Sequence, residues 1–266
     1  MATTDQSDTG QISGNVLFYS KPEPLSKEAH ANLGLRRIDK PYGFAAGSQV
    51  APLTVAEFPA AALSFPVIFA GERYQPLAVM GVNGDINMFI QPDGAFEAGV
   101  YIPAYIRRYP FVLANDPKGE QLVVCIDRAA PMLGDLPDMA FFDAAGEPTQ
   151  YTKNCMNFCN DFEVEVRRTD SFIALLKDLD LFESRTQTYT PSNPDGSPGA
   201  PQTVAEYFAI SETKLKALPP EKAQELLVNG AMGQIYAHLN SLLGWDRLIN
   251  LAIHRQSQAP QAANLN

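Results

Sequence analysis

GVYIPAYIRRYPFVL (residues 99–113) is followed by the polar segment NDPKGEQ (115–121) and by LVVCID (122–127). Proline is favoured in the first turn of a helix and disfavours helix at the residue before it. We therefore expect one short helix that begins at Pro103 and ends before Pro110. FVLA and LVVCID are short and apolar, which is typical of strands, and the Pro and Gly between them favour a turn. The stretch predicts a short helix followed by an antiparallel hairpin.

Several short apolar segments before this stretch also have the character of strands. They are VLFY (16–19), PVIFA (66–70), QPLAVMG (75–81) and INMFI (86–90). Short connections join strands that run in opposite directions, because parallel strands need a longer crossover. We therefore expect a mostly antiparallel sheet built largely from residues 45–145.

The hydrophobic period changes after this region. From Thr152 to Phe182, apolar residues recur every three to four positions, as one face of an amphipathic helix requires. The residues on this stripe are Cys155, Phe158, Cys159, Phe162, Val166, Phe172, Leu176 and Leu179. The spacing predicts a long helix over residues 152–182.

The remaining third of the chain predicts two strands and then helices. RTQTYT (185–190) and QTVAEYFAI (202–210) are strand-like and are joined by a loop rich in Pro and Gly. Helices are expected after Ser211, from Pro220 and over residues 231–254. The last of these is expected to break or bend at Gly244.

Together these elements predict an α+β fold. A mostly antiparallel sheet packs against the long amphipathic helix, and a C-terminal helical cap completes the core. The polar ends, residues 1–14 and 256–266, lack hydrophobic periodicity and are expected to be disordered tails. Residues 15–255 are expected to form a single domain, since a chain of this length is within the range of one.

Composition and charge limit the partners and the compartment. The 266 residues carry a formal net charge of −10, which argues against a nucleic-acid partner because such a surface requires clustered Lys and Arg. No window approaches the run of about 18 apolar residues that a membrane span needs. The first residues lack the order of a secretory signal, and an odd number of cysteines, three, suits a reducing compartment. We expect a cytoplasmic protein, with export by a non-classical route left open.

The usual spacings of metal and cofactor sites do not occur. Cys155 and Cys159 could supply half of a metal site or a redox pair, but a structural zinc site requires four ligands. Both cysteines lie on the apolar stripe of the predicted helix, so a place in the core is favoured. The sequence contains no HxH or HExxH spacing, no phosphate-binding glycine loop and no GxSxG motif. We expect no metal site and no cofactor.

The residue types best suited to binding lie in the short helix and directly after it. Arginine pairs with carboxylates and phosphates and stacks on aromatic rings. One interpretation is a ledge for an anionic ligand or peptide, formed by Tyr105, Arg107, Arg108 and Tyr109. The interpretation that we favour is internal pairing of the arginines with Glu57, Asp127 or Asp143. Adjacent helical residues point about 100° apart, so one guanidinium is expected to face solvent and the other the protein.

His238, in IYAHLNSL (235–242), is the best single candidate for an acid or base, because imidazole titrates near neutral pH. It lies among apolar residues of a predicted helix. A hydrogen-bonded core histidine is therefore the favoured interpretation.

The order of several segments resembles that of the SapC family, bacterial proteins named for surface-layer association. The segments are Phe44–Phe69, Tyr101–Leu113, Leu122–Asp127, Phe141–Thr149 and Ile235–Leu242. The resemblance implies a link to surface-layer biogenesis or transport. It implies no catalytic residues.

Three functions are consistent with these observations. The leading one is a noncatalytic binding or accessory factor with a protein partner in a surface or secretion pathway. The second is an enzyme acting on a surface polymer or peptide, in which an arginine holds an anion and His238, Glu57 or Asp127 acts as acid or base. The third is a structural homo-oligomeric module.

Overall fold

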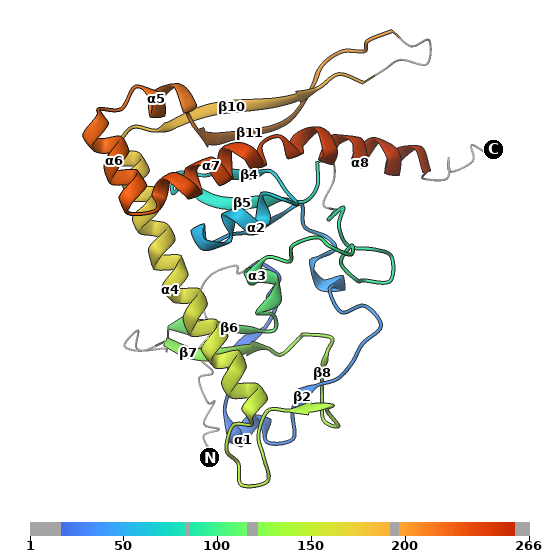
Figure 1. The fold of residues 1–266 in the computed structure, drawn as a ribbon. Helices are drawn as coiled ribbons and strands as arrows, with labels where there is room; N and C mark the ends of the chain where they lie inside the picture. Colours follow the sequence, from blue (N-terminus) through green and yellow to red (C-terminus); the bar gives the residue numbers. More distant parts are fainter. Residues whose placement is uncertain (1–16, 83–85, 116–121, 192–196, 259–266) are drawn as a thin grey trace, which may run out of the picture. The chain divides into compact units, whose positions relative to one another are not determined.

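The computed structural model of the chain describes residues 17–82, 86–115, 122–191 and 197–258. It contains antiparallel sheets and α-helices, of which α4 (Gln150–Asp178) has 29 residues (Figure 1). The α+β fold class is therefore confirmed. The chain divides into two compact units. Unit 1 comprises Met1–Phe44 and Arg108–Glu163, and unit 2 comprises Ala45–Arg107 and Val164–Asn266. The expectation of a single domain stays a prediction.

Unit 1 contains two small antiparallel sheets and the first half of α4. One sheet has the order β1–β7–β6 and consists of β1 (Pro22–Pro24), β6 (Phe111–Asn115) and β7 (Leu122–Asp127). The other has the order β8–β2–β9 and consists of β2 (Gly34–Leu35), β8 (Leu133–Gly134) and β9 (Met139–Ala140). The predicted hairpin is confirmed, since β6 pairs with β7 and Phe111 lies opposite Ile126.

Helix α1 (Lys27–His30) follows β1 in unit 1. Its N-cap is Ser26, whose Oγ accepts a hydrogen bond from the backbone N–H of Ala29 at 3.3 Å. A side-chain oxygen at this position satisfies one of the donors that the first turn of a helix leaves without a partner.

The core of unit 1 joins the hairpin to the first half of α4. Cys125 and Ile126 of β7 are buried together with Cys159 of α4. Phe111 of β6 meets Phe141 edge to face, with ring centroids 5.3 Å apart. Burial of a large apolar side chain stabilises a fold by roughly 1.5–3 kcal/mol. The first half of the long helix is therefore held by the apolar stripe that its sequence predicted.

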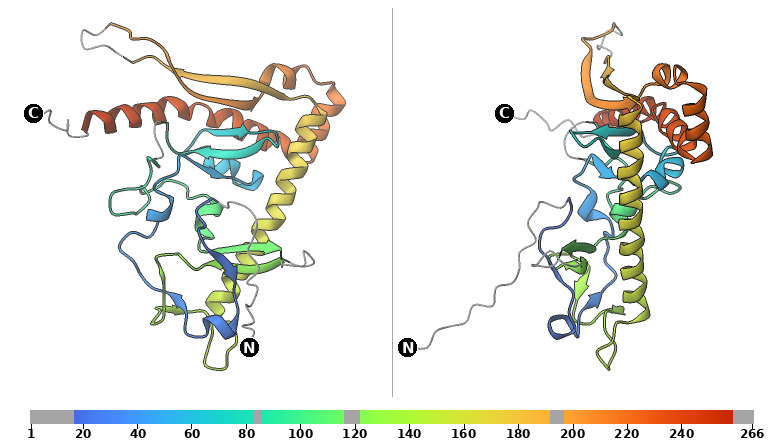
Figure 2. Two further views of the ribbon diagram at one scale, coloured as in Figure 1. Left: turned by 180° about the vertical axis from the view of Figure 1, so that it is seen from behind. Right: turned by 90° about the vertical axis from the view of Figure 1, so that its left-hand side faces the viewer.

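Unit 2 is built around a five-stranded antiparallel sheet with the order β10–β11–β4–β5–β3. Its strands are β3 (Val50–Pro52), β4 (Val67–Ala70), β5 (Gln75–Val79), β10 (Phe182–Tyr189) and β11 (Gln202–Ile210). β11 pairs with β4 at Phe208, which lies opposite Phe69. The far parts of β10 and β11 pair with each other as a two-stranded ribbon, which extends beyond the other strands in Figure 2.

The helices of unit 2 are mostly short. They are η2 (Val55–Glu57), α2 (Phe58–Ala61), α3 (Ala104–Arg107), the second half of α4, α5 (Glu212–Lys216), α6 (Pro220–Val228), α7 (Ala231–Ser241) and α8 (Gly244–Gln258). A further turn of helix, η1 (Gly43–Ala45), lies where the two units meet in sequence. No helix in the described ranges is long and apolar enough to cross a membrane.

The predicted break at Gly244 is confirmed, because α7 ends at Ser241 and α8 begins at Gly244. A Cβ atom at this glycine would lie 3.3 Å from the backbone nitrogen of Pro66, so a side chain here would crowd the start of β4. α8 continues through Gln258 and takes up the first three residues of the expected C-terminal tail. The rest of that tail and residues 1–14 lie outside the described residues.

The expectation of one sheet over residues 45–145 is wrong, because its strands belong to separate sheets. Two predicted strands are also wrong. Phe18 has a left-handed φ of 74°, which a strand does not accommodate, and Val16 lies outside the described residues. In INMFI (86–90), the side chain of Asn87 accepts a hydrogen bond from the backbone N–H of Phe89 at 2.9 Å and favours a turn. Met88, Phe89 and Ile90 are buried without forming a strand, and Ile86 is exposed.

Candidate functional site

A buried carboxylate, Glu57, organises the start of α3 in unit 2. Its Oε2 accepts hydrogen bonds from the backbone N–H and the hydroxyl of Thr54, at 2.8 and 2.9 Å. Its Oε1 accepts from the hydroxyl of Tyr101 at 2.9 Å and from the backbone N–H of Ala104 at 2.7 Å. The side chain is 7% exposed, so these four donors replace the water that a buried carboxylate requires.

Tyr101 connects this carboxylate to Arg107. The hydroxyl of Tyr101 accepts a hydrogen bond from Nη2 of Arg107 at 3.3 Å, and the guanidinium carbon lies 5.8 Å from the centroid of the tyrosine ring. Burial, and next the charge of Glu57, raise the pKa of Tyr101 to about 12. The phenol therefore keeps its proton near neutral pH and continues to donate to Glu57.

Arg107 is exposed and held in place. Its Nε donates to the backbone carbonyl of Ile102 at 2.9 Å, in addition to the contact with Tyr101. A guanidinium is planar and carries several N–H donors, a geometry that suits a carboxylate or a phosphate. The network Glu57–Tyr101–Arg107 therefore presents a positioned cation at the surface of unit 2.

Arg108 belongs to unit 1 and is buried, with 7% of the residue exposed. Its guanidinium carbon lies 4.5 Å from the ring centroid of Phe162 and 5.8 Å from that of Tyr19. Its Nη1 is 4.0 Å from a carboxylate oxygen of Glu163. The sequence indicated Glu57, Asp127 or Asp143 as the partner of the arginines, and Glu163 carried no sequence signal beyond its position on the long helix.

The two tyrosines of the proposed ledge are also buried. Tyr105 in unit 2 is 8% exposed and Tyr109 in unit 1 is 9% exposed. The hydroxyl of Tyr109 donates to a carboxylate oxygen of Asp127 at 3.0 Å, and its ring stacks on Phe44 with centroids 4.0 Å apart. Burial and the neighbouring Asp127 raise the pKa of Tyr109. Of the four ledge residues, Arg107 is the exposed one.

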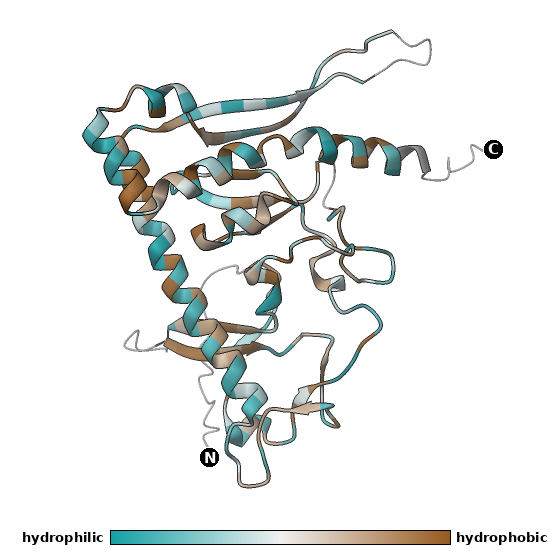
Figure 3. Ribbon diagram, in the orientation of Figure 1, coloured by the Kyte–Doolittle hydropathy of each residue, from teal (hydrophilic) through white to brown (hydrophobic). Residues whose placement is uncertain are grey.

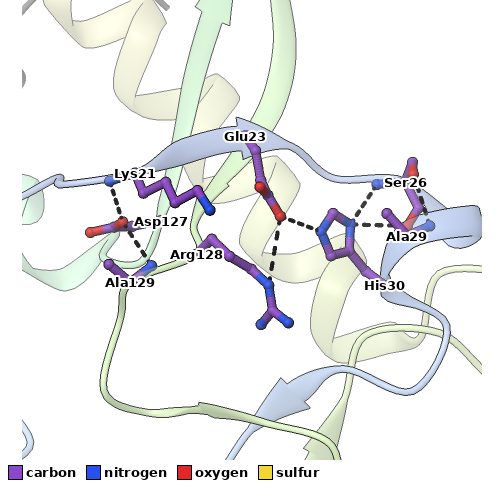
Figure 4. Close-up of polar contacts among 8 residues, drawn as sticks. All are labelled: Lys21, Glu23, Ser26, Ala29, His30, Asp127, Arg128 and Ala129. Atoms are coloured by element: carbon purple, nitrogen blue, oxygen red, sulfur yellow. Dashed lines mark hydrogen bonds and ion pairs between the residues drawn. The ribbon is translucent and has the colours of Figure 1, made fainter. Parts of the chain in front are cut away.

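Asp127 is fully buried at the end of β7 and serves the fold of unit 1. Its carboxylate accepts hydrogen bonds from the backbone N–H groups of Ser20, Lys21 and Ala129, at 3.0, 2.8 and 3.1 Å, as well as from Tyr109. Figure 4 shows this carboxylate between Lys21 and Ala129. It therefore fastens the segment before β1 to the end of β7.

The sequence did not predict the pair formed by His30 and Glu23. Nε2 of His30 lies 2.9 Å from Oε1 of Glu23, and Nε of Arg128 lies 3.7 Å from the same oxygen (Figure 4). The backbone N–H of Ser26 points to Nδ1 of His30 at 3.1 Å. His30 is 2% exposed, so this pair fixes the entry into α1. The available signal was the spacing of four residues between a cap and a histidine, which is too common to be diagnostic.

His238 lies on the buried side of α7 in unit 2. Its Nε2 accepts a hydrogen bond from the backbone N–H of Ile210 at 3.1 Å, and its ring centroid lies 5.0 Å from that of Phe69. Burial lowers the pKa of His238 to about 3. The ring is therefore neutral near pH 7, with its hydrogen on Nδ1, and it has no exposed surface.

The cysteines have the environment of core residues. All three are free, and Cys125 and Cys159 are buried. Burial raises the pKa of Cys125 to about 11 and that of Cys159 to about 12. Within the part of the chain that the structure describes, no group of three or more His, Cys, Asp or Glu side chains is placed to hold a metal ion.

A shallow hollow of about 750 Å³ lies on unit 1. Its lining is formed by Ala31, Asn32, Asp135, Leu136, Pro137, Ala140, Phe142, Asp143 and Ala144. The carboxylate of Asp143 already accepts from the backbone N–H groups of Ala145 and Glu147, at 2.9 and 3.0 Å. That carboxylate serves the turn that follows β9.

Comparison with protein families gives one finding. The model of a family described as SapC matches residues 25–248, which is most of the chain. Comparisons with curated proteins and with solved structures gave no match.

Proposed function

The chain belongs to the SapC family, and we propose that it acts as a noncatalytic binding or accessory protein in surface-layer or cell-surface biogenesis or secretion. The family resemblance supports the cell-surface part of the proposal. The side chains around α3 support the binding part.

The observation that carries the proposal is the position of Arg107. The chain has a net charge of −10, yet this guanidinium is exposed and held by Ile102 and Tyr101, with Glu57 behind the tyrosine. A cation that is already positioned loses little side-chain freedom when it binds a carboxylate or a phosphate. Arg107 is therefore the residue through which we propose that unit 2 contacts an anionic group of a partner.

The candidate acids and bases support a noncatalytic role. Glu57 and Asp127 each accept four hydrogen bonds from within their own unit. His238 is fully buried and neutral. A general base must come within hydrogen-bond reach of the proton that it takes from a substrate. An enzyme would therefore have to open the core of unit 2 to use His238.

We also propose that the protein acts from the cytoplasm. Its three free thiols suit a reducing compartment. Fractionation of the cells that produce it checks this: recovery in the cytoplasmic fraction supports the proposal, and intact protein outside the cell contradicts it.

The binding proposal is tested by affinity purification of the tagged full-length chain from the cells that produce it, with quantification of each co-purifying protein. Arg107→Glu reverses the proposed contact charge, and Arg73→Glu makes the same change at an exposed arginine in the turn between β4 and β5. We expect Arg107→Glu to lower recovery of the partner about tenfold, the effect of losing a contact worth about 1.4 kcal/mol, and Arg73→Glu to leave it unchanged. Equal recovery with both variants, or no specific partner of the wild type, would contradict the proposal.

A further inference from the structure

Unit 2 exposes a group of large apolar side chains along α7. The α7 face consists of Leu63, Leu227, Val228, Tyr236 and Leu243, with exposed fractions of 83, 69, 80, 42 and 81%. Leu227 and Val228 end α6, and α7 begins three residues later, so they lie at its N-terminal end. Figure 3 shows this end of α6 in the hydrophobic colour.

The other end of α7 is placed by its contacts with the start of β4. Oγ of Ser241 accepts a hydrogen bond from the backbone N–H of Val67 at 2.9 Å, and Gly244 lies against Pro66. Leu63 precedes Pro66 by three residues and follows α2, which contacts α7. Exposed apolar side chains therefore occur before, on and directly after α7, and exposed apolar patches are typical of interaction surfaces.

The apolar positions on α7 and just beyond it have a spacing that reads the same in both directions. Met232, Tyr236 and Leu239 of α7 and Leu243, two residues after its end, are separated by four, three and four residues. At 100° per residue the three positions within α7 fall within about 60° of one another around the helix axis. Met232 and Leu239 are half-buried, and Tyr236 and Leu243 are exposed.

A palindromic spacing is self-complementary under a two-fold axis. If two α7 helices cross antiparallel, Met232 of one copy lies opposite Leu243 of the other, and Tyr236 lies opposite Leu239. Each contact then occurs twice, as a two-fold interface requires. Gly233, beside the stripe, has no atom within 4 Å of the position of a Cβ, so a second helix can approach closely.

The charge distribution favours the same occupant. No Asp, Glu, Lys or Arg occurs from Gly230 to Trp245, although the whole chain has a net charge of −10. Two copies of an acidic protein repel one another over most of their surfaces, and this repulsion is least where the surface is uncharged. We infer that the α7 face binds a second copy of this chain, in an antiparallel α7–α7 dimer. The inference is independent of the proposed function of Arg107.

Light scattering coupled to size-exclusion chromatography tests this with the full-length chain over about 5–200 μM. We expect a dimer that Tyr236→Glu and Leu243→Glu each convert to a monomer, because a carboxylate at this position is buried opposite apolar side chains. Leu136→Glu is the matched control, since Leu136 is 91% exposed and belongs to unit 1. We expect this variant to remain a dimer.

Cross-linking tests the register separately. In the variant Tyr236→Cys/Leu239→Cys, each new thiol lies opposite a thiol of the other copy, so oxidation should join two chains. In the variant Tyr236→Cys/Gly233→Cys, both thiols lie on one side of the two-fold axis, and we expect at least tenfold less cross-linked dimer. Far-ultraviolet circular dichroism checks that each variant is folded. A monomeric wild type at 200 μM, or a dimer that persists in both glutamate variants, would overturn the inference, because the face would then have another occupant or none.

Discussion

The hydroxyl of Tyr101 donates a 2.9 Å hydrogen bond to the buried carboxylate of Glu57, although 44 residues separate them in sequence. Through this bond the start of α3 is fixed to the segment before α2. The same hydroxyl accepts from Arg107. The stability of unit 2 and the position of its exposed guanidinium therefore depend on one phenol.

Removal of that hydroxyl is expected to destabilise unit 2 modestly. Tyr101→Phe should lower the free energy of unfolding by about 1–2 kcal/mol, because one donor to a buried carboxylate is lost. Glu57→Gln should lower the free energy of unfolding by about 2–3 kcal/mol. The NH₂ group of the glutamine is itself a donor, so it cannot accept the hydrogen bonds that one carboxylate oxygen accepts in the wild type. Urea denaturation measures both, with Tyr189→Phe as the control on the outer part of β10. A Tyr101→Phe variant as stable as wild type would show that the bond contributes nothing.

The adjacent arginines should respond very differently to alanine. Arg108→Ala removes a guanidinium packed between Phe162 and Tyr19 and leaves Glu163 without it, so we expect a loss of about 2–4 kcal/mol. Arg107→Ala should change the free energy of unfolding by less than about 0.5 kcal/mol, as is usual for exposed positions. Thermal and urea unfolding of the two variants check this. Equal losses would contradict the difference in burial.

His238 should make stability fall as the pH falls below neutral. Its folded pKa, about 3, lies below the ordinary value of 6.5, so the unfolded chain binds a proton that the folded chain does not. This contribution is fully present above pH 6.5 and is lost progressively toward pH 3. Between pH 7 and pH 5 it amounts to about 2 kcal/mol.

The measurement is urea denaturation at pH 7, 6 and 5. His238→Gln should reduce the pH dependence by that amount, whatever its effect at pH 7, whereas His254→Gln, at an exposed position on α8, should preserve it. An unchanged slope in His238→Gln would mean that the imidazole titrates normally.

Thiol labelling should distinguish the three cysteines. Cys125 and Cys159 are buried with raised pKa values, so both the access of a reagent and the fraction of thiolate are low. At pH 8 we expect the folded chain to react at no more than one position, Cys155, and the chain in guanidinium chloride to react at all three. Rapid reaction of Cys159 in the folded chain would place it outside the core.

Local patterns in the sequence predicted the elements that depend on local physics. The apolar stripe of α4 and the hairpin β6–β7 were predicted because helical periodicity and turn residues are properties of short segments. The strand prediction for INMFI was wrong because apolar residues can be buried without a strand, and the side chain of Asn87 accepts a hydrogen bond from the backbone N–H of Phe89, which favours a turn. The grouping of strands into sheets depends on contacts between distant segments, which periodicity does not encode.

The candidate site shows the same division. The sequence predicted that one of Arg107 and Arg108 faces solvent and the other the protein, on the assumption that both lie in the helix, whereas α3 ends at Arg107. The sequence carried no information that Phe162 would cover one guanidinium or that Glu57 would stand behind Tyr101, because these partners come from α4 and η2. The pair of His30 and Glu23 depends on how β1 joins α1, and no spacing rule describes that junction.

The pairing of Pro22 with Asp127 has a consequence for the order in which the protein is made. β1 leaves the ribosome long before β7 exists, and at 5–20 residues per second the delay is about 5–20 s. Throughout that time the first strand of unit 1 has no neighbour, while the first half of unit 2 emerges. Nascent chains that stop before residue 127 therefore expose an unpaired segment to chaperones and proteases.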